Sequence, residues 1–166
     1  MNVKQGKEQF IQTWGKLGSS WGINRTMAQV HALLLVSENP LCTEEIMELL
    51  NVSRGNANMN IRELLNWNLL YKEIVAGERK EYFRAEKDIW EIAKRIARER
   101  KKREIEPVIR ELKQLQDIEG SSKETKEFIG TVKNIHAFAD KMDKSIENML
   151  KADENWFFGA IIKLLR

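Results

Sequence analysis

The stretch between residues 43 and 84 constrains the fold more than any other part of this 166-residue chain. Thr43 precedes two glutamates and an apolar face, so we expect its hydroxyl to cap a short helix whose first turn favours acidic side chains. After a short break at Asn51 and Val52, Ser53 is the expected N-cap of a second helix that runs to about Trp67. Two short helices joined by a tight turn predict a helix-turn-helix.

A β-hairpin is predicted directly after these two helices. Two short runs, residues 70–74 and 79–84, are rich in aromatic and β-branched side chains and flank a turn at Gly77. A hairpin in this place is a wing, so the whole region predicts a winged helix-turn-helix.

The rest of the chain favours helices, since it holds only 2 Pro and 9 Gly. Residues 24–37 are too apolar for a surface helix, which predicts a helix buried on most of its circumference. From Asp88 an apolar stripe continues past Pro107, where we expect a kink or a new helix with Pro107 in its first turn. Ser121 and Glu124 have the spacing of a capping box. The predicted fold class is mainly α with a small β-hairpin wing.

The second helix of the helix-turn-helix has a surface suited to DNA. At 100° per residue its apolar residues lie within about 80° of Ala57, and the opposite side is small, amide-rich and partly basic. Asparagine pairs with adenine and arginine with guanine in the major groove, and a wing with basic side chains reaches phosphate or the minor groove. The alternative is an ordinary solvated surface. The predicted DNA contacts are Thr43, Ser53, Arg54, Gly55, Asn56, Asn58, Met59, Asn60, Arg62, Arg79 and Lys80.

Charge is unevenly distributed along the chain, although the total is only +3. Residues 85–103 carry a net charge of +4, and residues 104–166 carry −2. The basic run at residues 98–103 is expected to be a solvated helix face, with attraction to DNA phosphates as the alternative.

Heptad-like spacing of apolar residues predicts a dimer interface. Apolar side chains alternate steps of four and three between Phe128 and Met149, which is typical of a coiled-coil-like seam. The N-terminal helix and the apolar segment after Asp153 are expected to join it. The predicted interface comprises Phe10, Trp14, Leu17, Phe128, Val132, Ile135, Ala139, Met142, Ile146, Met149, Phe157 and Ile161. The predicted parts are a dimerisation helix (1–23), a winged helix-turn-helix DNA-binding domain (24–87) and a C-terminal helical dimerisation region (88–166).

The five tryptophans are unusual for this length, and core or dimer packing is the default interpretation. The alternative is an effector site in which Trp14, Trp21 and Trp90 attract a quaternary ammonium ligand by cation–π interaction. His31 is expected to be a satisfied core residue, and Cys42 a buried inert thiol rather than a redox sensor.

Several function classes are disfavoured by what the sequence lacks. One cysteine and two histidines exclude a disulfide framework and disfavour a metal cage. We find no catalytic constellation, so we expect neither an enzyme nor a cofactor. No apolar run is long enough to span a membrane, and the first residues do not resemble a signal peptide, so a cytoplasmic protein is expected.

A set of short motifs resembles the GbsR-type branch of the MarR superfamily of winged-helix transcription regulators, over roughly residues 8–100. The motifs are Trp21 to Arg25, Pro40 with Leu41, Ser53 to Asn56, Arg62 to Leu64, Trp67 to Leu69, and Gly77 to Phe83. The resemblance implies a homodimeric DNA-binding regulator, often a repressor, whose terminal helices form the dimer. It places the start of the recognition helix at Ser53 and the wing at residues 77–80, and it leaves the effector open.

The sequence therefore predicts a homodimeric, sequence-specific DNA-binding transcription regulator. Its expected partners are double-stranded DNA with a pseudo-palindromic operator, a second copy of the chain and, as an open alternative, a small effector that relieves repression. The alternative function is a winged helix used as a protein-interaction module in a larger assembly.

Overall fold

A computed structural model describes residues 1–152 of the chain. It divides into two compact units, Met1–Ile92 and the residues from Ala93 onward, and each has its own packing. None of the helices in residues 1–152 is both long and apolar enough to cross a membrane.

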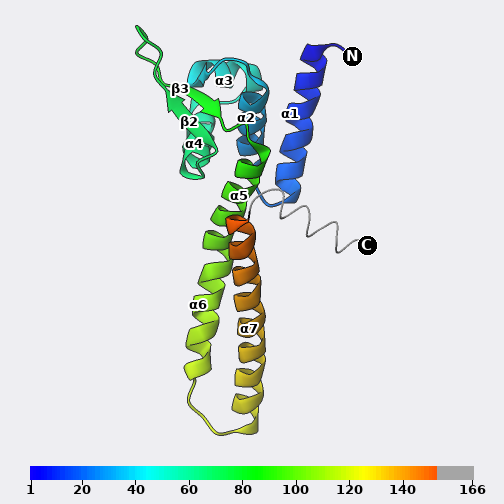
Figure 1. Cartoon of the computed structure of the whole chain (residues 1–166), viewed down its shortest axis with the longest axis vertical. Coiled ribbons are helices and arrows are strands. Elements are labelled where there is room, and N and C mark those ends of the chain that lie inside the picture. The colour runs from blue at the N-terminus through cyan, green and yellow to red at the C-terminus, as the bar shows by residue number, and fades with distance from the viewer. Residues whose placement is uncertain (153–166) are drawn as a thin grey trace. The chain divides into compact units, whose positions relative to one another are not determined.

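The first unit is a winged helix-turn-helix, which confirms the predicted fold class (Figure 1). Its elements are α1 (Val3–Ser20), α2 (Arg25–Val36), β1 (Leu41–Cys42), α3 (Thr43–Leu50), α4 (Arg54–Asn66), β2 (Leu70–Glu73) and β3 (Tyr82–Ala85). From α2 onward the order helix, strand, helix, helix, strand, strand places the hairpin directly after the helix-turn-helix.

The sheet has three antiparallel strands with β3 in the centre. β2 pairs with β3 through Leu70 opposite Ala85, and β1 pairs with the other edge of β3 through Leu41 opposite Phe83. The sequence predicts the β2–β3 hairpin but not β1. Two residues are too few to show an alternating pattern, and the partner of β1 lies some forty positions further along the chain.

Helix α2 forms the centre of this unit, as its apolar composition predicts. Most of its residues are buried, and it packs against α1, α3, α4 and β3. The side chains that complete this core come from the other elements: Ile46, Ala57, Ile61, Leu64, Phe83 and Ala85.

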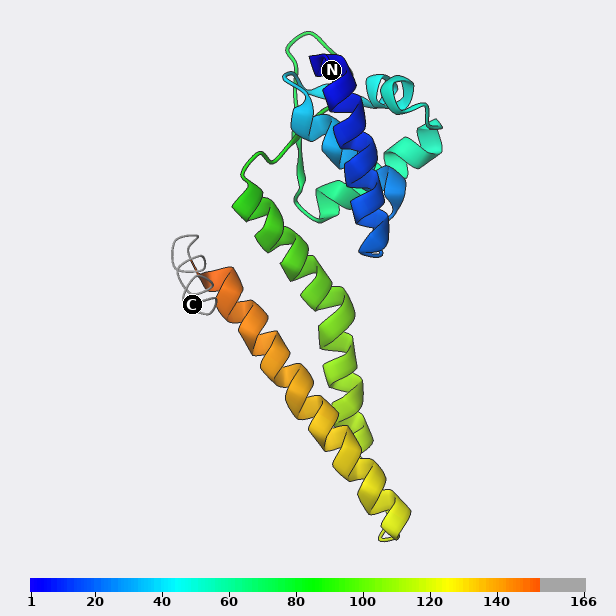
Figure 2. The ribbon, with the colours of Figure 1, turned by 90° about the vertical axis from the view of Figure 1, so that its right-hand side faces the viewer.

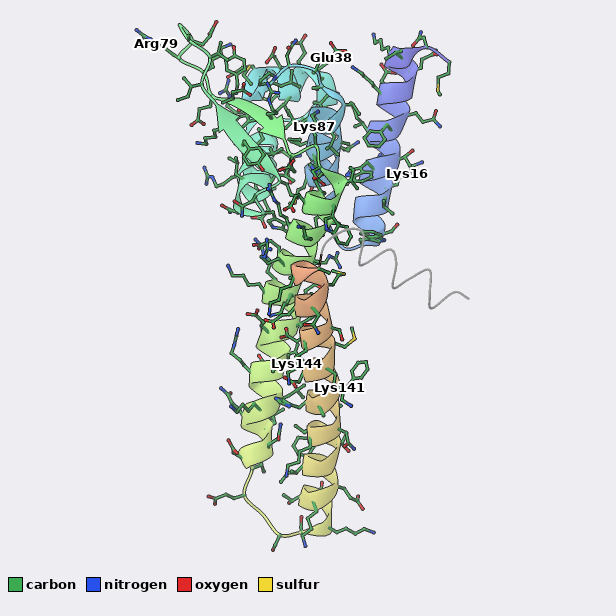
Figure 3. All side chains as sticks on the ribbon, in the orientation of Figure 1. Lys16, Glu38, Arg79, Lys87, Lys141 and Lys144 are labelled. Carbon is green, nitrogen blue, oxygen red and sulfur yellow. The ribbon has the colours of Figure 1, made fainter. Side chains whose placement is uncertain are left out.

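Lys87 stabilises the C-terminal end of α2. Its ammonium group donates hydrogen bonds to the carbonyls of Leu34 (2.9 Å), Leu35 and Ser37 (3.1 Å). These carbonyls have no partner within the helix, and a cation is favoured at this end of the helix dipole. These bonds tie the chain after β3 back to α2, and Figure 3 labels Lys87 on this segment.

The caps of α3 and α4 shape the turn between them. The backbone N–H of Cys42, not the Thr43 hydroxyl, marks the start of α3: it donates to Glu45 Oε2 at 2.7 Å. The expectation that Thr43 is the N-cap was wrong, because the chain is still extended in β1 at Cys42 and Thr43 is already helical. Ser53 caps α4 as predicted, since its hydroxyl accepts from the N–H of Asn56 at 3.3 Å. Asn51 adopts a left-handed conformation (φ 51°) that ends α3.

Helix α1 lies against α2 through glycines, and Figure 2 views this unit from the side that α1 covers. The residues of α1 that are buried are Ile11, Gly15 and Gly18. The predicted apolar stripe sits at the margin of this contact: Phe10 and Trp14 are half-buried, whereas Leu17 and Trp21 are exposed. A Cβ atom at Gly18 would lie 2.6 Å from the Cβ of Ala28. The close approach of α1 to α2 therefore requires a residue without a side chain at position 18.

His31 is buried in α2 as predicted, but it is not fully satisfied. It is 3% exposed and its ring lies 6.3 Å from that of Trp14. Within residues 1–152, its Nε2 atom has no hydrogen-bond partner. Burial, and then the positive charge of Lys87, lower the pKa of His31 to about 4.

The second unit is built around a pair of antiparallel helices. Its elements are most of α5 (Ile89–Arg100), the π-helical turn η1 (Lys101–Ile105), α6 (Glu106–Gln114), the short 3₁₀ turn η2 (Leu115–Asp117) and α7 (Lys123–Lys151). Figures 1 and 2 both show α7 returning alongside α6. Pro107 lies in the first turn of α6, which agrees with one of the two predicted alternatives. The N-cap of α7 is Ser122 rather than Ser121, since the Ser122 hydroxyl accepts from the N–H of Thr125 at 3.0 Å.

An ion-pair cluster joins α7 to η1 and α6. The side chain of Lys101 is only 11% exposed, and its ammonium lies 2.9 Å from Glu106, 3.0 Å from Asp143 and 3.6 Å from Glu147. The hydrogen bond to Glu106 raises the pKa of Lys101 above its usual range, with Asp143 adding to the effect. Lys101 is therefore a fixed charge between the two helices.

The α1–α2 contact predicts a stability change at Gly18. Gly18→Ala should lower the free energy of unfolding by about 1–3 kcal/mol in urea denaturation, because two Cβ atoms cannot occupy the same gap. Gly6→Ala is the matched control: nothing lies within 4 Å of a Cβ there, so this variant should be unchanged or slightly more stable. Adding Ala28→Gly to Gly18→Ala should recover part of the loss, and a Gly18→Ala variant as stable as the wild type would contradict the packing.

The burial of His31 predicts a dependence of stability on pH. The pKa of His31 is about 4 in the folded chain, against the ordinary value of 6.5 in the unfolded chain. Between pH 4 and pH 6.5 the unfolded chain therefore binds a proton at this residue that the folded chain does not bind. The free energy of unfolding should fall as pH drops from 6.5 to 4, by up to about 3 kcal/mol from this residue. Denaturation of the wild type and of His31→Gln across this range measures the effect. Equal slopes in the two proteins would show that His31 does not cause it.

Candidate nucleic-acid interface

The outer edge of α4 is the main candidate surface. Ala57, Ile61 and Leu64 bury the inner side of this helix against the core. The opposite edge stays in solvent and presents an amide, a thioether and two guanidinium groups without any covering element. The exposed side chains on it are Arg54, Asn58, Met59 and Arg62, with Gly55 between them. Met59 is 58% exposed, far more than methionine in a core.

Asn60 does not belong to this surface, which corrects the sequence prediction. The side chain is 2% exposed, and its amide donates to the backbone carbonyl of Asn56 at 2.8 Å and to the Asn56 Oδ1 at 2.7 Å. Asn60 lies about 60° from Ala57 around the helix, inside the apolar arc, so its angle was the signal for burial. An amide placed there is turned inward by packing and satisfied within the helix.

Asn56 links α4 to α2 rather than standing in solvent. Its Oδ1 accepts from Asn60, and its amide nitrogen lies 3.5 Å from the Thr26 hydroxyl. The side chain is half-buried. Because two neighbours already orient it, Asn56 is the positioning member of the three asparagines, and Asn58 is the one whose side chain stays exposed.

The first turn of α4 is tied to α3 by polar contacts. Arg54 forms an exposed ion pair with Glu44 at 2.8 Å, and the Thr43 hydroxyl lies 3.4 Å from Asn58 Oδ1. A backbone hydrogen bond within Glu44 is the largest influence that lowers the pKa of this carboxyl, with contacts to Cys42 and Arg54 next. The start of α4 therefore combines the Arg54 guanidinium, which is paired with Glu44, with the N–H groups of a helix N-terminus, and such N–H groups favour an anion.

The wing adds two basic side chains. Gly77 turns the loop between β2 and β3 with φ 84°, a conformation that favours glycine. Arg79 and Lys80 follow it in solvent, and neither forms an ion pair with any residue in 1–152. Figure 3 shows Arg79 near the end of the loop, pointing away from the helices. Cross-strand pairs hold the hairpin itself: Lys72 with Glu81 at 2.6 Å and Arg84 with Glu73 at 2.8 Å.

Ile74 is a surface residue of the wing that the sequence analysis missed. It lies directly after β2 and is 94% exposed. The strand pattern assigned it to the hairpin, but β2 ends at Glu73, so its side chain has no sheet to pack on. A single exposed isoleucine is common on protein surfaces, so Ile74 does not by itself mark a binding surface.

The tryptophans of the predicted effector site have different surroundings. Trp14 stacks at 5.4 Å from Phe10 and lies near His31, Trp90 is half-buried, and Trp21 is 57% exposed at the end of α1. The cation–π site that would combine Trp14, Trp21 and Trp90 stays a prediction.

The predicted seam on α7 divides into two parts. Val132 is buried, and Ala139, Ile146 and Met149 are half-buried. Three members of the seam remain exposed, Phe128 (44%), Ile135 (49%) and Met142 (45%), together with Phe138 (66%), which the sequence analysis did not select. Phe157 and Ile161 lie outside the described residues. The exposed members fall within an arc of about 80° on α7, so they form one apolar strip.

Residues 1–152 contain no group of three or more histidine, cysteine, aspartate or glutamate side chains that could hold a metal ion.

Comparison with solved structures supports the fold. A crystal structure described as a transcriptional regulator matches with a TM-score of 0.68, covering 88% of this chain and 96% of that chain at 19% sequence identity. A second match, the adhesin competence repressor AdcR from Streptococcus pyogenes, has a TM-score of only 0.36 at 21% identity, with 86% of this chain and 99% of that chain covered. The sequence matches no family model and no curated protein. At 19% identity the first likeness shows the fold alone, so the GbsR-type resemblance stays a prediction.

Proposed function

We propose that this chain is a homodimeric, sequence-specific DNA-binding transcription regulator that represses its target genes. The observation that carries the proposal is the uncovered edge of α4, where Asn58, Met59 and Arg62 are exposed beside one another. These three side chains offer an amide, a soft apolar group and a guanidinium fork, which are the groups that read base edges.

The recognition step follows from the chemistry of these side chains. With α4 in a major groove, the amide of Asn58 can pair with the N6 and N7 atoms of adenine, and Arg62 can pair with O6 and N7 of guanine. Met59 lies on the other side of Arg62 from Asn58 and suits the methyl group of thymine. Asn56 and Asn60 support this edge from within by fixing the first two turns of α4.

Phosphate contacts would set the register of the helix on DNA. Arg79 and Lys80 on the wing, and the N-terminal turn of α4 with Arg54, are separate cationic or N–H-rich points on the same unit. Such contacts contribute affinity without sequence information. Ile74 would add an apolar contact to the sugar edge beside the wing.

A second copy would bind through the exposed apolar strip on α7. The strip formed by Phe128, Ile135, Phe138 and Met142 is too apolar for a surface that stays in water, and Leu17 and Trp21 leave a further exposed edge on α1. A two-fold dimer would present two recognition helices to half-sites about one helical turn apart. This arrangement assigns residues 1–23 and 88–166 to dimerisation and residues 24–87 to DNA.

Two likenesses support regulation of transcription. The fold is shared with a protein described as a transcriptional regulator, and the sequence motifs resemble a superfamily in which repressors are common. A small effector would relieve repression by binding one dimer state more tightly than the other.

Two substitutions should separate base reading from phosphate binding. Asn58→Ala should reduce the preference for operator over bulk DNA by roughly 5- to 100-fold, because one bidentate base contact is lost. Lys80→Ala should weaken binding to all DNA alike and lower the salt slope by about one. Fluorescence anisotropy with the promoter region of the protein's own gene and with bulk duplex, across salt concentrations, measures both effects.

Lys16→Ala is the charge-matched control for Lys80→Ala. Lys16 lies on α1, and Figure 3 places it on the opposite side of the unit from the wing residue Arg79. This variant should bind like the wild type. A wild-type protein without any preference for the promoter region would contradict the proposal and favour a protein-interaction role.

A charged residue in the strip on α7 should separate the dimer. Ile135→Asp places a carboxylate in the proposed interface, and sedimentation velocity should then show monomers where the wild type shows dimers. Lys133→Asp is the control on the same helix, about 140° away from both Phe128 and Phe138, and should stay dimeric. A dimeric Ile135→Asp protein would show that the interface lies elsewhere.

A further inference from the structure

The lining of a pocket in the second unit contains more cationic side chains than carboxylates. Its volume is about 400 Å³, and it lies where α5 and η1 face the end of α7. The lining is four cations, two carboxylates and one leucine: Arg98, Lys101, Lys102, Lys151, Glu106, Glu147 and Leu150. Pockets of roughly 300–1,000 Å³ are the usual size for small ligands.

Among residues 1–152, Lys101 is the one lining cation that forms ion pairs. Lys101 takes both lining carboxylates, Glu106 at 2.9 Å and Glu147 at 3.6 Å, and also Asp143 behind them. Arg98, Lys102 and Lys151 form no ion pair with any residue between 1 and 152. Three cations from two helical segments therefore line one pocket without a carboxylate ion-pair partner in residues 1–152.

The backbone at this point also departs from a regular helix. Lys101 to Ile105 form a π-helical turn, which is rare and is frequently found at functional sites. Arg98 and Lys102 stand one turn apart on the same strip, a like-charge spacing that disfavours the helix. A like-charge pair and an irregular turn therefore lie together in the lining of the pocket.

We propose that this pocket binds a small organic dianion, a dicarboxylate or a phosphate ester. The guanidinium of Arg98 would pair with two oxygens of the anion through its planar fork, and Lys102 and Lys151 would add point charges. Leu150 gives the pocket an apolar wall for the carbon part of the ligand. The inference goes beyond DNA binding and does not depend on it.

A DNA backbone is the less suitable occupant of the same charges. The two carboxylates of Glu106 and Glu147 lie in the lining itself and would repel a run of phosphates crossing the surface. A small anion can instead sit against Arg98 and the two lysines while the carboxylates remain paired with Lys101.

Calorimetric titration of the full chain with succinate and with phenyl phosphate, at ionic strength held constant with sodium chloride, tests the proposal. The wild type should bind at least one of the two probes. Arg98→Gln and Lys151→Gln should each weaken that binding roughly tenfold, and Arg98→Lys should lie between Arg98→Gln and the wild type, since it keeps the charge but loses the fork.

Lys113→Gln and Lys141→Gln are the matched controls, because they remove one exposed lysine each from α6 and α7 outside the pocket. They should bind like the wild type, and circular dichroism should show all variants folded. The proposal is overturned if neither probe binds the wild type, or if the pocket variants bind as the controls do. It is equally overturned if Arg98→Gln weakens binding to bulk duplex DNA and lowers its salt slope while no probe binds, since the cations would then serve DNA. None of these outcomes depends on preference for the promoter region.

Discussion

The burial of α2 is the interaction on which the first unit depends. This helix has almost no polar face, so the unit must cover it on all sides, and α1, α3, α4 and β3 do so. Helix α1 packs closely on one side of α2 because Gly18 allows it to approach Ala28. Lys87 closes the end of the helix by binding its last carbonyls, and the same charge helps to keep His31 neutral.

The surface that we assign to DNA is a consequence of that burial. Since Ala57, Ile61 and Leu64 must face α2 and its neighbours, the opposite edge of α4 is fixed as the edge in solvent. Asn60 falls on the buried side and turns back onto Asn56, which in turn reaches Thr26 on α2. The polar residues of α4 therefore have two tasks: the inner ones orient the helix, and the outer ones remain available to a partner.

The second unit uses charge in a comparable way. Lys101 is held by three carboxylates and joins α7 to the start of α6, so it is part of the structure. Its neighbours Arg98 and Lys102 belong to the same basic run, which the sequence analysis treated as a solvated face. Among the cations that line the pocket, Lys101 is ion-paired, whereas Arg98 and Lys102 form no ion pair within residues 1–152. The apolar strip on α7 shows the same division, because Val132 serves the helix pair and Ile135 does not.

Sequence periodicity was sufficient for the elements that are determined locally. The helix-turn-helix, the hairpin and the buried α2 follow from the Ser53 cap, the turn residues and the spacing of apolar side chains, all of which act within a few residues. Only the tertiary structure could decide which polar residues of a strip stay outside. Pairing of the two-residue strand β1 with β3, and the choice of Lys101 among the five basic residues of 98–103, depend on groups distant in sequence. A spacing pattern defines a helix face, but only the packing of another element against that face determines which side chains it covers.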